Sequence, residues 1–271
     1  MTYTQKVKME RNTTMDLPPL SIENTKFKFT NEIIRVDNRI LFRIVALRDV
    51  GNIKKGMLGG FIEKEANLEI NSNAWVFNNA KVCGNAQICE DAKVFGNALV
   101  CRDAKVYGNA IICNDAEVFG IAKVYGNAWI GGNAKVYGNA QISDNAWICG
   151  NAKISDNAWI YGNAKILDYV RVYGNAWVFG DAKVYENAWV SGKTWTYGNA
   201  QIFGNAKVYE NAQVYDDAKI YGYAQVYGNA HVFKNVIVNG ETKIYGYAQV
   251  CENTAEYGHA WIYELFKKLR R

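Results

Sequence analysis

Histidine, the most frequent catalytic base, is rare in this 271-residue sequence. The two histidines are His231 and His259, and a catalytic base needs a partner that is placed to orient it. No Gly-rich phosphate loop, nucleophile elbow or Cys–His pairing accompanies them in the sequence. The residue types therefore predict a protein without catalytic residues, without a cofactor and without a metal site.

The sequence repeats every six residues from Ala74 to Ala260, and this repeat must position the side chains of any functional site. Thirty-two successive hexads are close to Gly-Asn-Ala-Lys-Val-Tyr, and an aliphatic residue stands two places after the alanine slot in all except two of them. The exceptions are Thr196 and Glu256. Such self-similarity is typical of a solenoid, whose function can lie only on its faces, its corners and its ends.

The chemistry of one hexad predicts a short strand followed by a bend. Alternation along Ala-Lys-Val places the alanine and the aliphatic residue on the inner face and the residue between them on the outer face. Glycine and asparagine tolerate left-handed backbone, so we expect the Gly-Asn pair to form the bend. Alanine suits a narrow interior, and each fully buried Val or Ile contributes roughly 1.5–3 kcal/mol to stability.

The sequence before the repeats differs in character. Residues 1–25 are polar and without period, and we expect a flexible or loosely docked tail there. Apolar runs on either side of Asp37-Asn38-Arg39 predict a β-hairpin, so residues 26–66 should form a cap and a lead-in segment. We expect the β-helix at residues 67–262 and a short basic tail at residues 263–271.

Two parts of the sequence resemble known proteins. The hexad at residues 136–141 resembles the hexapeptide repeat of left-handed parallel β-helices, although Tyr137 departs from the small second position. The run Gly59-Gly60-Phe61-Ile62-Glu63 resembles the lead-in segment of the YdcK-like group of these proteins. The resemblance implies an all-β, single-stranded left-handed parallel β-helix of about eleven coils, with three hexads in each coil and a small N-terminal β-cap. It also implies an acyltransferase-like fold without an established reaction, and similar chains occur among phage-derived sequences.

If three hexads make one coil, each outer face is a column of residues eighteen positions apart. His231 then lies between Gln213 and Gln249, and no carboxylate in that column could orient it. Hexapeptide-repeat acyltransferases typically use a histidine base and a loop extruded from the helix, whereas this repeat has no insertion. We therefore interpret His231 as a surface imidazole.

The same column carries three consecutive tryptophans, Trp159, Trp177 and Trp195, with Gln141 and Gln213 beyond its two ends. All eight tryptophans of the sequence fall in outward slots. One interpretation is a ladder of stacked rings that only stabilises neighbouring coils. The other is a binding surface, because a contiguous exposed indole strip is rare on soluble monomers and Trp is enriched at binding hot spots.

Net charge is +5, yet the repeat region is close to neutral and the excess positive charge lies at the ends of the chain. This balance makes nucleic acid an unfavoured partner, although the basic ends do not exclude it. Another face carries the column Lys135, Lys153 and Arg171, which we interpret as a solvated surface. Like charges at strand spacing repel, and only an anionic partner would turn that repulsion into a gain.

One corner loses the asparagine pattern and offers a secondary candidate site. Its successive residues include Tyr223, Glu241 and His259, whose side chains can all form hydrogen bonds. A tyrosine in a left-handed bend would cost about 1–2 kcal/mol relative to glycine. The alternative is that these are relaxed end coils, since terminal repeats are usually atypical.

The cysteines all occupy the repeat slot that otherwise holds Tyr or Phe, so we interpret them as packing residues of a reducing cytoplasm. They are Cys83, Cys89, Cys101, Cys113, Cys149 and Cys251. The sequence shows no apolar run long enough to span a membrane and no signal peptide at its start.

Two hypotheses for function follow. The first is a cytoplasmic, non-enzymatic binding or scaffold protein whose flat aromatic face docks a protein partner or another copy of itself. An inhibitor encoded by a phage is a specialised form of it. The alternative is an acyltransferase-like enzyme with its active site at a subunit interface.

Overall fold

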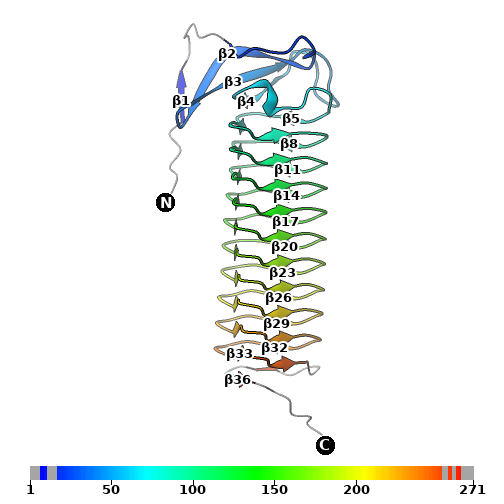
Figure 1. Cartoon of the computed structure of the whole chain (residues 1–271). Helices are drawn as coiled ribbons and strands as arrows, with labels where there is room; N and C mark the ends of the chain where they lie inside the picture. The colour runs from blue at the N-terminus through cyan, green and yellow to red at the C-terminus, as the bar shows by residue number, and fades with distance from the viewer. Residues whose placement is uncertain (1–6, 11–16, 252–255, 258–260, 264–271) are drawn as a thin grey trace, which may run out of the picture. The chain divides into compact units, whose positions relative to one another are not determined.

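The computed structural model describes residues 7–10, 17–251, 256–257 and 261–263 (Figure 1). The chain divides into an N-terminal unit, Met1–Gly132, and a C-terminal unit, Asn133–Arg271. Each unit consists of β-strands and bends, and the described residues contain one short 3-10 turn and no α-helix.

The N-terminal unit begins with a cap of four antiparallel strands. They are β1 (Val7–Glu10), β2 (Phe27–Val36), β3 (Arg39–Ala46) and β4 (Leu58–Ile62), paired in that order. The β2–β3 pair confirms the hairpin that the apolar runs predicted. Strand β1 belongs to the segment for which we expected a flexible or loosely docked tail, so that segment adds an edge strand to the cap.

The cap meets the coils at two adjacent glycines in β4. A Cβ atom added at Gly59 would lie 2.6 Å from Ile44 Cγ1, and one added at Gly60 would lie 2.6 Å from the Ala80 carbonyl oxygen. Strand β4 can therefore pair antiparallel with β3 and parallel with β6 (Lys81–Val82) only because both positions lack a side chain. The 3-10 turn η1 (Glu65–Asn67) follows and leads into the first coil.

Each coil strand is two or three residues long and pairs in parallel with strands three places away, as in β10–β13. The other coil strands of the N-terminal unit are β5 (Trp75–Val76), β7 (Gln87–Ile88), β8 (Lys93–Val94), β9 (Leu99–Val100), β10 (Lys105–Val106), β11 (Ile111–Ile112), β12 (Glu117–Val118), β13 (Lys123–Val124) and β14 (Trp129–Ile130).

The C-terminal unit contains coil strands alone. They are β15 (Lys135–Val136), β16 (Gln141–Ile142), β17 (Trp147–Ile148), β18 (Lys153–Ile154), β19 (Trp159–Ile160), β20 (Lys165–Ile166), β21 (Arg171–Val172), β22 (Trp177–Val178), β23 (Lys183–Val184), β24 (Trp189–Val190), β25 (Trp195–Thr196), β26 (Gln201–Ile202), β27 (Lys207–Val208), β28 (Gln213–Val214), β29 (Lys219–Ile220), β30 (Gln225–Val226), β31 (His231–Val232), β32 (Ile237–Val238), β33 (Lys243–Tyr245), β34 (Gln249–Val250), β35 (Glu256–Tyr257) and β36 (Trp261–Tyr263).

The alanine and aliphatic slots form the interior, as the alternation predicted. Ala140 and Val136 are completely buried, and so are nearly all residues of the same two slots in both units. Together the units hold about eleven turns of an all-β parallel solenoid, which confirms the predicted fold class. The fold is consistent with the left-handed winding that the resemblance implied.

The bends differ from the prediction in one respect. The left-handed residue is the one before the asparagine slot, for example Gly138 with φ 68° or Asp144 with φ 57°, whereas the asparagine slot itself is not left-handed. Asparagine has another role, because its amide bonds to the equivalent residue one coil further. Asn139 Nδ2 donates to Asn157 Oδ1 at 3.0 Å, and Asn157 Nδ2 donates to Asn175 Oδ1 at 3.2 Å. The corners are therefore amide ladders.

Candidate binding faces

The three tryptophans of the predicted surface stack on consecutive coils of the C-terminal unit. The ring centroids of Trp159 and Trp177 are 5.2 Å apart at 7°, and those of Trp177 and Trp195 are 5.6 Å apart at 13°. Strands β19, β22 and β25 pair in register, which places the indoles directly above one another. We call these three side chains the Trp strip.

A second aromatic ladder runs beside the Trp strip, at the corner that follows it. Tyr161 and Phe179 stack at 4.8 Å, Phe179 and Tyr197 stack at 4.9 Å, and Tyr161 meets the edge of Trp177. From Tyr161 to Tyr197 every coil carries a ring at this corner, so beside the three indoles the two ladders form one continuous surface. One coil before Tyr161 the same corner carries the buried Ser143. Mutual stacking leaves Trp159 and Trp177 half-buried, while Trp195 keeps 42% of its surface exposed.

Gln141 and Gln213 lie at the two ends of the Trp strip, as the spacing predicted. Gln141 is in register with Trp159, and Gln213 is in register with Trp195. Both side chains are half-buried. The structure thus brings the five residues of the main candidate site into one column, whereas the binding role of that column stays a proposal.

A tryptophan in an outward slot of the repeat is not always exposed to solvent. Trp75 stands in an outward slot but is completely buried, and its Nε1 has no hydrogen-bond partner. The expectation of a surface side chain was wrong there because β4 of the cap lies against β5, where Trp75 is located. Trp147, in contrast, is 45% exposed.

The secondary candidate site is assembled only in part. Tyr223 is 64% exposed and its N–H donates to the Gly240 carbonyl oxygen at 2.7 Å, so Tyr223 and Glu241 lie near each other on one corner. The predicted strain at Tyr223 was wrong, because the left-handed residue is Gly222, with φ 70°. His259 lies outside the described residues.

His231 lies on the Trp-strip face between Gln213 and Gln249, as the spacing predicted. Its imidazole meets the edge of the Tyr215 ring with centroids 6.4 Å apart, and burial lowers the pKa of His231. No hydrogen bond to a described residue orients this ring.

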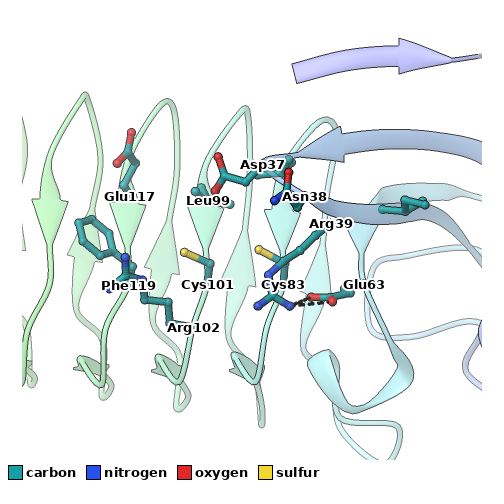
Figure 2. A pocket seen from close by; sticks show the side chains of 12 residues that line it. Asp37, Asn38, Arg39, Glu63, Cys83, Leu99, Cys101, Arg102, Glu117 and Phe119 are labelled. Carbon is teal, nitrogen blue, oxygen red and sulfur yellow. Dashed lines mark hydrogen bonds and ion pairs between the residues drawn. The ribbon is translucent and has the colours of Figure 1, made fainter. Parts of the chain in front are cut away.

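The N-terminal unit holds a cavity of about 590 Å³ that was not predicted from the sequence (Figure 2). The tip of the β2–β3 hairpin overhangs one face of the coils there, and the thiols of Cys83 and Cys101 lie on that face. A hydrogen bond between the two thiols raises the pKa of Cys83 and lowers that of Cys101. The lining residues are Val36, Asp37, Asn38, Arg39, Ile40, Glu63, Cys83, Leu99, Cys101, Arg102, Glu117 and Phe119.

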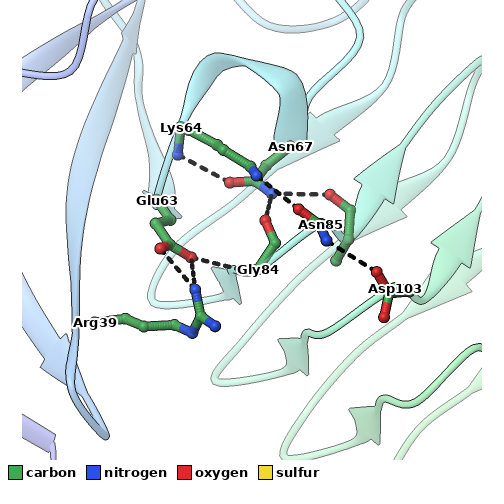
Figure 3. Close-up of polar contacts among 8 residues, drawn as sticks. Arg39, Glu63, Lys64, Asn67, Gly84, Asn85 and Asp103 are labelled. Atoms are coloured by element: carbon green, nitrogen blue, oxygen red, sulfur yellow. Dashed lines mark hydrogen bonds and ion pairs between the residues drawn. The ribbon is translucent and has the colours of Figure 1, made fainter.

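Polar contacts beside this cavity join the hairpin tip and the η1 turn to the first coils (Figure 3). Glu63 accepts two hydrogen bonds from Arg39 Nη1, at 2.8 and 3.0 Å, and a third from the Gly84 N–H. Asn67 Nδ2 donates to the carbonyl oxygens of Gly84 and Ala86. The bonds of Glu63 to Arg39 and Gly84 connect the hairpin tip to the first coils. The charges of Arg39 and Glu63 therefore have a structural role. The described residues contain no cluster of three or more His, Cys, Asp or Glu that could hold a metal ion.

The geometry defines the chain as a hexapeptide-repeat parallel β-helix protein. Residues 200–216 match the family model of the YdcK β-solenoid repeat, so this part of the chain is similar to that family. The lead-in segment at residues 59–63 had predicted this relation. These comparisons do not support the phage origin that the resemblance suggested.

Two solved structures are similar to the chain. The UDP-N-acetylglucosamine acyltransferase of Arabidopsis is 16% identical with a TM-score of 0.46, over 66% of this chain and 69% of that chain. The UDP-N-acetylglucosamine O-acyltransferase of Moraxella catarrhalis is 17% identical with a TM-score of 0.24, over 65% and 68% respectively. At these levels neither likeness bears on the activity of this chain. No curated protein matches it.

Within the described part of the chain, no helix has the length and the apolar run that crossing a membrane requires.

Proposed function

We propose that this chain is a non-enzymatic binding protein and that the Trp strip is where a protein partner docks. The observation that carries the proposal is the continuous stack of Trp159, Trp177 and Trp195 beside a second filled aromatic ladder. Stacking holds these rings rigid, so a partner would lose little side-chain entropy in covering them.

The surroundings of the Trp strip support a protein partner. Interfaces combine an aromatic centre with a polar rim, and Gln141 and Gln213 supply amides at both ends of the strip. The outward residues of this column carry no carboxylate from Gln141 to Gln249. Affinity would therefore come from desolvation of the indoles, and a second copy of this chain is one form that the partner could take.

The test compares two tryptophans. Trp177→Ala removes the centre of the strip, and removal of a hot-spot tryptophan costs about 2 kcal/mol or more, which is about a thirty-fold loss of affinity. Trp147→Ala is the control, because Trp147 is 45% exposed on a different face. In pull-downs with the tagged chain, Trp177→Ala should lose a protein that wild type and Trp147→Ala retain.

Sedimentation of the same variants identifies self-association, which Trp177→Ala should shift to monomer. If both variants keep full binding and the same oligomeric state, the strip only stabilises the coils. The non-enzymatic part has its own test, since calorimetric titration with acetyl-coenzyme A should show no saturable heat. Saturable binding would favour the acyltransferase alternative.

A further inference from the structure

A different face of the C-terminal unit concentrates positive charge. Its outward residues pair in register at successive coils and comprise five cations, one tryptophan, one glutamine and no acid. We call this the basic face, formed by Lys135, Lys153, Arg171, Trp189, Lys207, Gln225 and Lys243. The Arg171 guanidinium and the Lys207 ammonium lie 5.5 and 5.4 Å from the Trp189 ring, one on the coil before it and one on the coil after it.

The corner beside the basic face is an aromatic ladder with two rungs missing. Tyr209 and Tyr227 stack at 4.8 Å and 4°, and Tyr227 and Tyr245 stack at 5.2 Å. Earlier in the same column, Ser155 lies between Tyr137 and Tyr173, and Ser191 lies between Tyr173 and Tyr209. Both serines are buried, at 7% and 9% exposure, so neither fills the space that a ring would occupy.

The Tyr173 ring has the same orientation as the rings of a fully stacked ladder, although both of its neighbours in the column are serines. It meets Trp189 edge-on at 66°, as Tyr161 meets Trp177 at 76°, and Tyr161 belongs to a fully stacked ladder. A missing rung thus leaves a gap between two phenol rings two coils apart, which is about 9.6 Å. One flat ring in the middle of that gap would lie about 4.8 Å from each neighbour, the spacing that the protein's own rungs adopt.

Each gap is a hollow on the surface. The hollow at Ser155 has a volume of about 390 Å³ and is lined by Tyr137, Lys153, Ser155, Arg171 and Tyr173. The hollow at Ser191 has a volume of about 260 Å³ and is lined by Tyr173, Trp189, Ser191, Lys207, Val208, Tyr209 and Gln225. A third, of about 490 Å³, lies along the other edge of the same face, where Lys153, Arg171 and Lys207 line it again. None of the three linings contains a carboxylate.

Three of the acidic residues at the adjoining corners accept hydrogen bonds from backbone N–H groups. Asp156 Oδ2 accepts from the Gly174 N–H at 3.0 Å, Asp168 Oδ2 from the Glu186 N–H at 3.1 Å, and Glu210 Oε2 from the Gly228 N–H at 2.8 Å. These carboxylates accept from the backbone at the bends, beside the cations Lys153, Arg171 and Lys207.

We propose that the basic face binds single-stranded nucleic acid, with bases seated at Ser155 and Ser191 between the tyrosine rings and with phosphates against Lys153, Arg171 and Lys207. Proteins that bind single strands without sequence preference combine a positive track for the backbone with aromatic side chains on which bases stack. Each nucleotide supplies one flat base and one negative phosphate. Along the basic face, gaps between tyrosine rings could hold the bases, and cations at successive coils could contact the phosphates. A paired base would have to leave its duplex before it could enter a hollow, so single strands are favoured over duplex.

In the sequence analysis, the near-neutral charge of the repeat region made nucleic acid an unfavoured partner. That balance averages three faces, whereas a strand contacts only one. The like charges of Lys153 and Arg171, in register on adjacent coils, repel each other, and phosphates that lie between them would relieve this repulsion. The charge relevant to binding is therefore that of the face.

Filling the missing rungs tests the proposal without disturbing the fold. In Ser155→Tyr/Ser191→Tyr, tyrosine enters the slot where the same ladder already carries it, so the hollows close and the cations remain. Binding of fluorescein-labelled twelve-nucleotide oligo(dT) and oligo(U), followed by anisotropy at fixed salt, should weaken by about tenfold or more for each closed hollow. Ser143→Tyr fills the missing ring position between Tyr125 and Tyr161, at the corner of the Trp-strip face; it is the matched control and should bind oligonucleotide as wild type.

Charge is tested separately with Lys153→Gln and Lys207→Gln, against Lys183→Gln on another face. Each of the first two should weaken binding and reduce the slope of log affinity against log salt by about 0.7. Lys183→Gln should change neither. Absence of oligonucleotide binding, equal binding by the filled variant, or equal competition by a duplex or by dextran sulfate would overturn the proposal. Because the Trp strip is on another face, this outcome is independent of the protein-docking test.

Discussion

Two faces of the C-terminal unit are built from the same hexad and differ in what fills their outer slots. From Trp159 to Tyr197 on the Trp-strip face, the indoles and the adjoining rings of Tyr161, Phe179 and Tyr197 fill the outer slots of three successive coils. On the basic face, Ser155 and Ser191 interrupt the tyrosine ladder and cations replace the indoles. The first surface is flat and the second is hollowed.

The difference shows how a solenoid without loops can acquire distinct sites. The backbone of each coil is set by the buried alanine and aliphatic slots, so an outward residue can change without altering the fold. A filled ladder offers a broad apolar area that suits another protein surface. A ladder with a missing rung offers a slot of defined width that suits a single flat ring.

The largest expected loss of stability comes from a substitution in the interior that both faces share. Ala140→Trp forces an indole into a space where Ala140 is already completely buried, and we expect a loss of about 3 kcal/mol or more. Gln141→Trp adds one indole to the end of the Trp strip and should change stability by less than about 1 kcal/mol. Thermal unfolding of the two variants makes the comparison. Equal losses would show that the inward and outward slots are wrongly assigned.

A smaller change in stability is expected from the buried threonines beneath the Trp strip. Thr194 and Thr196 flank Trp195 in sequence, are completely buried, and have hydroxyls without a hydrogen-bond partner. An unsatisfied buried hydroxyl costs about 1–3 kcal/mol, so Thr194→Ala and Thr196→Val should each raise the free energy of unfolding by about that amount. Val214→Thr, one coil after Thr196, should have the opposite sign. Unchanged unfolding in denaturant would mean that the hydroxyls find partners in solution.

A third effect, of similar size, concerns the missing ring positions in the absence of ligand. Ser191→Tyr creates two new ring stacks, with Tyr173 and Tyr209, and each such pair contributes about 0.5–1.5 kcal/mol. We expect the melting temperature to rise slightly. A fall would show that the slot does not accept a ring at all, and it would remove the geometric basis for a bound base.

The periodic features of the molecule could be read from the sequence. Alternation predicted the burial of Val136 and Ala140, and the eighteen-residue spacing predicted the stacking of Trp159 on Trp177. The position of the left-handed residue was not predicted correctly, since Gly and Asn both tolerate that conformation. In the structure Gly138 is left-handed, and Asn139 bonds through its side chain to Asn157 on the next coil.

The non-periodic features could not be read in this way. Trp75 has the slot of a surface residue, and its burial depends on how β4 lies against β5, which no repeat specifies. The cavity beside Cys83 and Cys101 depends in the same way on where the hairpin tip lies. The serines at 155 and 191 were visible in the sequence, but their meaning required the stacking distance of the rings beside them.

The most direct test of the account is to measure both kinds of binding on one pair of variants. Trp177→Ala should lose the protein partner and bind twelve-nucleotide oligo(dT) as wild type does, while Ser155→Tyr/Ser191→Tyr should keep the partner and lose the oligonucleotide. That crossed result would establish two independent faces on one repeat. Loss of both kinds of binding in the same variant, or of neither in both variants, would contradict it.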